Sequence, residues 1–110
     1  MVVRFFRTAA AREPVREWLR GLDRESKKAI GEDIKTVQFG WPVGMPVVRK
    51  LERDPWEVRS SLPNSIARVL FTVYDDSIVL LHGFIKKAKK TPKKDLELAL
   101  ARLKMLRGTT

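Results

Sequence analysis

The sequence predicts a small α+β domain, in which two N-terminal helices cover one face of an antiparallel sheet and a last helix follows it. Three observations favour this class. Two consecutive apolar stripes at helical spacing follow a short β-branched segment. Three apolar runs separated by turn signals then form a pattern typical of an antiparallel meander. A leucine-rich helical stripe ends the chain, so we expect the order β-α-α-β-β-β-α in a single domain, residues 1–110.

The N-terminal part is predicted to contain one strand and two helices. Residues 2–8 (VVRFFRT) are rich in β-branched and aromatic residues, which favours a strand. Residues 9–22 repeat apolar side chains every three or four positions, and residues 23–39 do the same, with Asp23 as a candidate N-cap. Gly40 ends the second helix. Because each apolar stripe must be buried, both helices are expected to pack on the sheet.

The middle of the chain is predicted to form a loop and then extended segments. Residues 40–46 (GWPVGMP) fit neither a helix nor a strand, because prolines and glycines dominate them. Trp41 in this loop is expected to pack over the edge of the core, with stacking on RNA as the alternative. Residues 47–54 are expected to form a short extended piece. The meander has strands at 56–62, 66–74 and 77–84.

The C-terminal segment is predicted to be a helix that begins after Thr91 as N-cap, with Pro92 at its first position. Its apolar stripe ends before Gly108. This stripe contains more leucine than one small sheet obviously needs. We therefore expect the stripe, or the basic groove beside it, to dock a protein partner.

The second hairpin of the meander predicts which side chains share a face. A two-residue turn at residues 75–76 would place Val69 opposite His82 and Arg68 opposite Gly83. His82 would then lie on the apolar face below the N-terminal helices, where a hydrogen-bonded core role and a catalytic role both stay open. Arg68 would point the other way, with space above the adjacent glycine.

The first hairpin brings two arginines together. A four-residue loop at residues 62–65 would place Arg59 directly opposite Arg68, because Pro63 cannot adopt the positive φ of a tight two-residue turn. Such a pair is unfavourable by a few tenths to about 1 kcal/mol unless an anion lies between the two guanidinium groups. A phosphate meets that requirement. A surface salt network with Glu57 is the alternative.

The net charge of +10 is unevenly distributed along the chain. Residues 1–40 carry nine Lys/Arg against six Asp/Glu, residues 41–81 carry five against five, and residues 82–110 carry nine against two. A basic region this concentrated favours nucleic acid, an acidic membrane surface or an acidic protein as partner. A solvated basic connection that only keeps the protein soluble is the alternative.

Several classes of function are excluded by composition. The chain has no cysteine and one histidine, which excludes disulfides, thiolate metal sites and an ordinary zinc site. No run approaches the roughly 18 apolar residues of a membrane span. The N-terminus does not read as a signal peptide, so we expect a cytoplasmic protein that does not enter the membrane. No metal or other cofactor is expected.

The basic side chains suggest chemistry on RNA. If the sheet arginines and the lysines after Phe84 converge, they form a cationic pocket without the clustered carboxylates of a metal-dependent nuclease. In metal-free cleavage the ribose 2′-OH attacks the adjacent phosphate, and cations stabilise the developing charge. The candidate catalytic residues are Arg59, Arg68 and Lys87, and either Lys86 or Lys87 could transfer a proton. The candidate nucleic-acid-binding residues are Lys50, Lys86, Lys89, Lys90 and Lys93.

These segments also carry a family resemblance. The stretches WEVRSSL, IARVLFTVY and LLHGFIKKAKKTP resemble the RelE/ParE superfamily of bacterial type II toxins, and most of all its phage-derived, HigB-like branch. The resemblance runs from Trp56 to Leu106, and the N-terminal half agrees in the order of its elements. It implies a small RelE-like α+β toxin. Arg59 and Arg68 match basic sheet residues that hold the scissile phosphate, and Lys87 or Lys86 matches the basic residue after the last strand.

The resemblance also implies partners. Such toxins cleave mRNA on the ribosome and are neutralised by a cognate antitoxin, in this branch a helix-turn-helix, HigA-like protein, through which the complex contacts operator DNA indirectly. Two departures concern the acid and base: Glu57 stands where some relatives have lysine, and no aromatic residue lies in 91–110, where some relatives place a catalytic tyrosine. A non-catalytic protein that binds RNA or an acidic partner, and a ParE-like gyrase inhibitor, are the alternatives.

Overall fold

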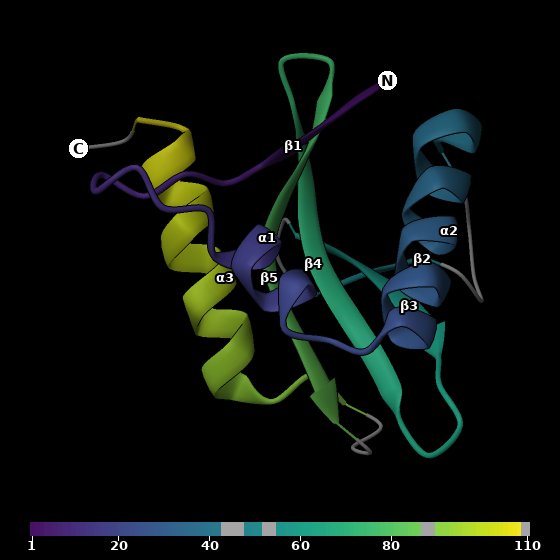
Figure 1. Cartoon of the computed structure of the whole chain (residues 1–110). Coiled ribbons are helices and arrows are strands. Elements are labelled where there is room, and N and C mark those ends of the chain that lie inside the picture. Colours follow the sequence, from purple (N-terminus) through teal and green to yellow (C-terminus); the bar gives the residue numbers. More distant parts are fainter. Residues whose placement is uncertain (43–47, 52–54, 87–89, 109–110) are drawn as a thin grey trace.

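A computed structural model describes residues 1–42, 48–51, 55–86 and 90–108 (Figure 1). The predicted order of elements is confirmed, and a further short strand lies where an extended piece was expected. The strands are β1 (Val2–Phe5), β2 (Val48–Lys50), β3 (Trp56–Ser61), β4 (Ile66–Tyr74) and β5 (Ser77–Lys86). The helices are α1 (Pro14–Arg20), α2 (Arg24–Gly40) and α3 (Lys93–Leu106).

The five strands form one mixed sheet in the order β1-β5-β4-β3-β2. The neighbouring strands from β2 to β5 are antiparallel, as predicted, whereas β1 pairs with β5 in parallel. The expectation of a wholly antiparallel sheet was therefore wrong at one edge. The cause is topological: β1 is joined to the meander through α1 and α2, and this crossover returns the chain to the far side of the sheet.

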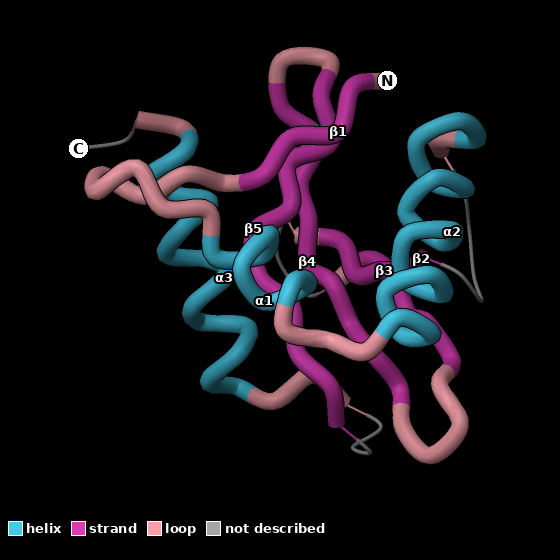
Figure 2. The backbone as a smooth tube through the Cα atoms, viewed as in Figure 1, coloured by secondary structure: helices cyan, strands magenta, loops and turns pink. Residues whose placement is uncertain are grey.

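Helices cover both faces of the sheet. Figure 2 views the sheet from its β1 edge, with α3 on one side and α2 on the other. The apolar cluster on the α1/α2 face includes Val15, Ile30, Val37, Val58, Val69, Phe71, Ile78 and Leu80. The cluster on the α3 face includes Phe6, Leu70, Val79, Leu81, Ala99 and Leu103, with Leu96, Leu100 and Leu106 packed against it. The predicted placement of the two N-terminal helices on one face is thus confirmed.

The leucine stripe of α3 is largely buried against the sheet. Its residues pack on the α3-face cluster, and Leu98 and Met105 are the large apolar side chains of α3 that are exposed. The expected surplus of leucine is therefore absent from the described helix. No helix among the described residues has the length and hydrophobicity to cross a bilayer.

Local signals explain the helix starts only in part. Asp23 is the N-cap of α2, as predicted, and its Oδ2 accepts a hydrogen bond from the Ser26 backbone N–H at 3.4 Å. The expected start of α3 was wrong by one residue, because Pro92 takes the N-cap position and the helix begins at Lys93. The Thr91 hydroxyl does not cap the helix but donates to a carboxylate of the sheet.

The first hairpin has the predicted register. Arg59 pairs with Arg68 and Ser61 pairs with Ile66, across the four-residue loop 62–65. The Trp41 ring, at the end of α2, packs edge-on against Trp56 at 5.0 Å and Phe71 at 5.6 Å between centroids. The expected role of Trp41 at the edge of the core is confirmed.

The second hairpin departs from the predicted register halfway along. The two-residue turn has Asp75 and Asp76 at positive φ, and the pairing agrees with the prediction as far as Phe71 with Leu80. A β-bulge then inserts Leu81, so that Arg68 pairs with Phe84 instead of Gly83. The predicted pairings of Arg68 and His82 were therefore wrong.

Candidate anion and nucleic-acid site

Two arginines face each other on the α3 face of the sheet. Arg59 on β3 lies opposite Arg68 on β4, and Phe84 on β5 completes this row. The Arg68 side chain is fully buried, whereas 24% of the Arg59 side chain is exposed. Of the two sheet arginines, Arg59 is therefore the one that a ligand can reach in this conformation.

A buried carboxylate lies beside the arginines. Glu57 is two residues before Arg59 on the same face, and its side chain is fully buried. Its Oε1 lies 3.7 Å from Nε of Arg59, and its Oε2 accepts a hydrogen bond from the Thr91 hydroxyl. The salt network that was the alternative reading thus exists in part, and it ties the segment before α3 to β3. The cluster thus combines the carboxylate of Glu57 with the guanidinium groups of Arg59 and Arg68.

The bulge moves His82 to this same face. It pairs with Leu70, whose neighbour on β3 is Glu57, so His82 lies one row from the arginines. Its Nε2 lies 2.7 Å from Oδ1 of Asp95 in the first turn of α3, and its ring stacks on Phe84 with 5.5 Å between centroids. The expectation that His82 faces the N-terminal helices was wrong, because one inserted residue reverses every later side chain of the strand.

The His82–Asp95 pair has the geometry of an oriented base. Only 15% of the His82 side chain and 13% of the Asp95 side chain are exposed. When the carboxylate accepts the N–H of Nε2, the neutral imidazole presents its lone pair at Nδ1. Within the part of the chain that the structure describes, no hydrogen bond occupies Nδ1. This nitrogen is therefore suited to accept a proton.

The predicted lysines are divided between the two faces. Lys86 pairs with Ile66 and so lies on the arginine face, with its Nζ 3.9 Å from Oδ2 of Asp95. Lys90 and Lys93 are exposed around the start of α3. Lys50 lies on the opposite face, with its ammonium 5.4 Å from the ring centroid of Trp56. The sheet thus separates Lys50 from the arginines, and Lys87 and Lys89 lie outside the described residues.

Sequence reasoning missed the roles of Asp95 and Thr91. Both lie in the segment where α3 starts, and both reach strands far away in sequence. An acidic residue in the first turn of a helix is normally explained by the helix dipole, so Asp95 gave no separate signal. Among the residues that the structure describes, no three His, Asp or Glu side chains meet as metal ligands would.

Comparison with known proteins places most of the chain in one family. The family model described as "Phage derived protein Gp49-like (DUF891)" matches residues 17–104. This range extends from α1 almost to the end of α3 and includes every residue of the site described above. No curated protein matches the chain.

Proposed function

Because the chain belongs to the Gp49-like family of phage-derived proteins, a RelE/ParE-like family of toxins from toxin–antitoxin systems, we propose that it is a ribosome-dependent mRNA endoribonuclease. Family membership implies an antitoxin partner. The finer proposals are that the substrate is mRNA on the ribosome and that the antitoxin is a helix-turn-helix, HigA-like protein. The observation that carries the nuclease proposal is the cationic Arg59–Arg68 row beside an Asp-oriented histidine on one face.

In the proposed reaction the RNA supplies its own nucleophile. The ribose 2′-OH attacks the adjacent phosphorus, its oxygen forms a new P–O bond, and the bond from phosphorus to the 5′ oxygen breaks. The proton of the 2′-OH passes to Nδ1 of His82, and Asp95 stabilises the imidazolium that forms. The products are a 2′,3′-cyclic phosphate and a 5′-hydroxyl, whose proton comes from Lys86 or Lys87.

The cations act on the charge that develops on the phosphate. Arg59 is partly exposed and contacts the phosphate oxygens, for which its planar fork of donors is suited. Arg68 is fully buried, so in this proposal it raises the positive potential from below the site instead of touching the RNA. Lys90 and Lys93 hold the flanking phosphates. Stabilisation of this kind is worth about 10²- to 10³-fold in rate for one donor group.

The test is induction of the chain and of single variants, with mapping of new 5′ ends on ribosome-bound mRNA. Arg59→Ala should reduce cleavage by about 10²-fold or more, since it removes a charged donor to the transition state. His82→Gln and Asp95→Asn should each reduce cleavage under single-turnover conditions while leaving RNA binding nearly unchanged. Lys27→Ala, an exposed change on α2, is the matched control and should cleave like the parent.

The outcomes separate the competing functions. Growth arrest with intact mRNA and a DNA-damage response would contradict the nuclease proposal and favour gyrase inhibition. RNA binding with neither cleavage nor arrest would favour the non-catalytic binding protein. Folding of each variant is checked by circular dichroism and by its urea midpoint, since His82 and Asp95 also join α3 to the sheet.

A further inference from the structure

The β-bulge in β5 decides on which face of the sheet His82 lies. Residues 77–80 of β5 pair with β4 in one register and residues 82–86 pair in the next, with Leu81 inserted between them. Leu81 and His82 therefore both lie on the α3 face, and Gly83 faces α1. Without the inserted residue the histidine would not lie beside the arginine row.

A regular pairing of the same two strands is the competing arrangement. In that register His82 would lie opposite Val69, on the face that α1 and α2 cover. Phe84 and Ile85 would only exchange faces, so the burial of these apolar side chains does not by itself choose between the two registers. A contact directed at the bulge itself can make that choice.

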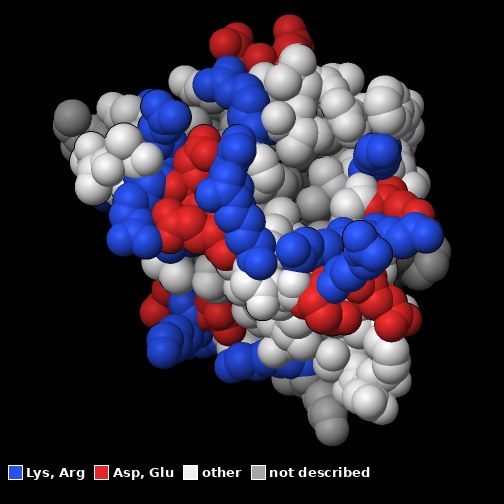
Figure 3. Space-filling view, in the orientation of Figure 1, with Lys and Arg blue, Asp and Glu red and all other residues white. Residues whose placement is uncertain are grey.

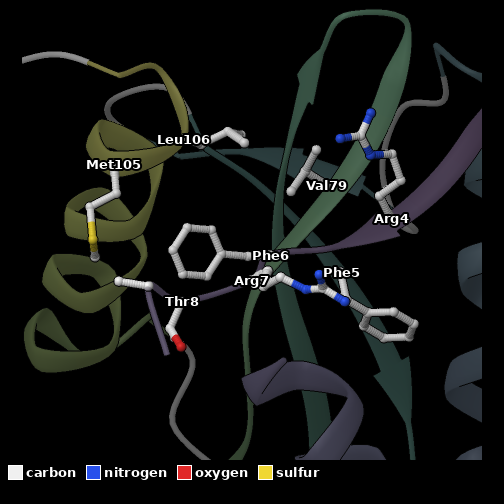
Figure 4. A pocket seen from close by; sticks show the side chains of 9 residues that line it. Arg4, Phe5, Phe6, Arg7, Thr8, Val79, Met105 and Leu106 are labelled. Carbon is white, nitrogen blue, oxygen red and sulfur yellow. The ribbon is translucent and has the colours of Figure 1, made fainter. Parts of the chain in front are cut away.

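A guanidinium group from α3 makes such a contact. Nη1 of Arg102 donates a hydrogen bond to the carbonyl oxygen of Leu81 at 2.7 Å, between residues 21 positions apart. This length is at the short end for an N–H···O bond, as expected for a charged donor. The guanidinium also lies over the Phe6 ring, 5.9 Å from its centroid, and Figure 4 shows the Phe6 side chain pointing toward α3. Arg102 is thus held between α3, the segment after β1 and the bulge.

The helix α3 contacts two consecutive residues of β5 through one of its faces. Asp95 and Arg102 lie about two turns apart on the same face of the helix. Asp95 contacts the ring of His82, and Arg102 contacts the backbone of the preceding residue, Leu81. Asp95 can orient the ring only while His82 lies on the α3 face, which is the arrangement that the Arg102 hydrogen bond favours.

The bulged register is also supported from the other face of the sheet. It turns Gly83 toward α1, where the Trp18 ring lies so close that an added Cβ would be 2.4 Å from Cε3. The two contacts act on β5 from opposite faces. Loss of the Arg102 contact alone should therefore shift the balance between the two registers without unfolding the sheet.

We propose that Arg102 is the positioning residue of the candidate base. Its hydrogen bond to the Leu81 carbonyl stabilises the bulged register, and this register keeps His82 on the face of the arginines with Asp95 against its ring. Arg102 acts through His82 and does not touch the RNA. The inference rests on the proposed function only for the part that His82 plays in cleavage, since the placement of the ring does not depend on it.

Two simpler roles for Arg102 predict different results. Its stem could merely pack beside Phe6, and its charge could merely add to a basic surface. Figure 3 shows Lys and Arg side chains across the middle of the molecule, so loss of one cation alone should change RNA binding little. Neither role predicts that His82 changes faces.

The test of position compares Arg102→Met with Arg102→Lys by NMR of the full chain. Methionine keeps an apolar stem without a donor, whereas lysine keeps the charge and a donor. In the parent, cross-strand NOEs should join His82 to Leu70, and its ring should show NOEs to Phe84. Arg102→Met should weaken these NOEs and add NOEs from His82 to Val69. Arg102→Lys should keep the pattern of the parent.

The test of function measures cleavage of ribosome-bound mRNA by the same proteins. Arg102→Met should lower single-turnover cleavage by about 10²-fold, the effect expected when a reacting group is misplaced by about 1 Å. Lys104→Met is the matched control, because it removes one positive charge from an exposed position of the same helix, and it should cleave like the parent. RNA affinity should be similar in the two methionine variants, and Arg102→Lys should recover most of the cleavage.

Two results would overturn the inference. One is His82 paired with Leu70 in Arg102→Met as fully as in the parent, whatever the rate of cleavage. The other is an equal loss of cleavage in Arg102→Met and Arg102→Lys, which would assign Arg102 a packing role that lysine cannot fill.

Failure of this inference is distinguishable from failure of the proposed function. A parent that does not cleave mRNA, together with the NOE change in Arg102→Met, would reject the nuclease and keep the role of Arg102 in placing the His82 ring. Cleavage by the parent that Arg102→Met retains, with unchanged NOEs, would keep the nuclease and reject the role of Arg102. Should Arg102→Met fail to fold by circular dichroism, Arg102→Gln, whose shorter side chain does not reach the Leu81 carbonyl, supplies the same comparison with Arg102→Lys.

Discussion

At the scale of single residues, the absence of a side chain at Gly83 decides how α1 meets the sheet. A Cβ placed on Gly83 would lie 2.4 Å from Cε3 and Cζ3 of the Trp18 ring. Real side chains do not approach so closely, so the indole packs there because position 83 is a glycine. The glycine thereby seats α1 and sets the distance between this helix and β5.

We predict that Gly83→Ala destabilises the protein by about 1–3 kcal/mol, because the methyl group forces the Trp18 ring or β5 to move. The free energy of unfolding is measured from urea titrations at pH 7. Gly31→Ala is the control: it lies inside α2 with no atom within 4 Å of the added methyl. The control should be neutral or more stable by up to about 1 kcal/mol, since alanine favours a helix. Equal stability of Gly83→Ala and its parent would contradict the packing of Trp18 on β5.

At the residue scale, the position of Arg59 could be predicted from the sequence, whereas that of His82 could not. Arg59 could be placed opposite Arg68 because proline at position 63 excludes a tight turn and so fixes the loop length. His82 could not be placed, since the bulge at Leu81 has no signal in an unbroken apolar run. The one-residue shift in strand register places His82 on the face opposite to the predicted one. The sequence therefore did not predict the half of the candidate site that contains His82.

At the scale of elements, apolar periodicity locates the helices and strands well, whereas contacts distant in sequence decide how they are joined. Asp23 was found as the N-cap of α2 because capping is a local interaction, and Gly40 is the last residue of the helix, as predicted. The start of α3 is fixed differently: Thr91 bonds Glu57 on β3, and Asp95 bonds His82 on β5. A pairing between residues 34 positions apart leaves no local pattern, so the sequence could not predict it.

The cap of α2 predicts a dependence of stability on pH. The hydrogen bond from Ser26 lowers the pKa of Asp23 below its ordinary value of 3.8. A carboxylate whose pKa is lower in the folded state stabilises the fold above pH 3.8 and loses that contribution as the pH falls through the folded pKa. Asp23→Asn keeps an oxygen that can cap the helix but cannot titrate.

We therefore expect the parent to have a higher urea midpoint than Asp23→Asn at pH 7, and the difference to shrink as the pH falls below 3.8. Glu17 also has a lowered pKa, because of its hydrogen bond from Arg12, but this interaction is common to both proteins and cancels in the difference. A difference that does not change between pH 7 and pH 3 would contradict the assignment of the pH effect to Asp23.

At the scale of the whole molecule, the net charge of +10 is less informative than the places of the basic residues in the fold. The proposed RNA site lies on the α3 face of the sheet, in the rows of Arg59 and His82. The basic residues around the start of α3 belong to this proposed site, whereas those of α2 lie on the opposite face of the sheet.

This separation predicts that RNA binding depends on which lysines are removed and not only on how many. Lys90→Ser with Lys93→Ser should reduce the slope of log affinity against log salt for single-stranded RNA by about 1.4, since each phosphate contact contributes about 0.7. Lys27→Ser with Lys28→Ser removes the same charge from exposed positions on α2 and should change the slope much less. Equal decreases in the two double variants would mean that net charge alone attracts the RNA. A decrease confined to the first variant would locate the nucleic acid on the α3 face, where the arginine row and His82 lie.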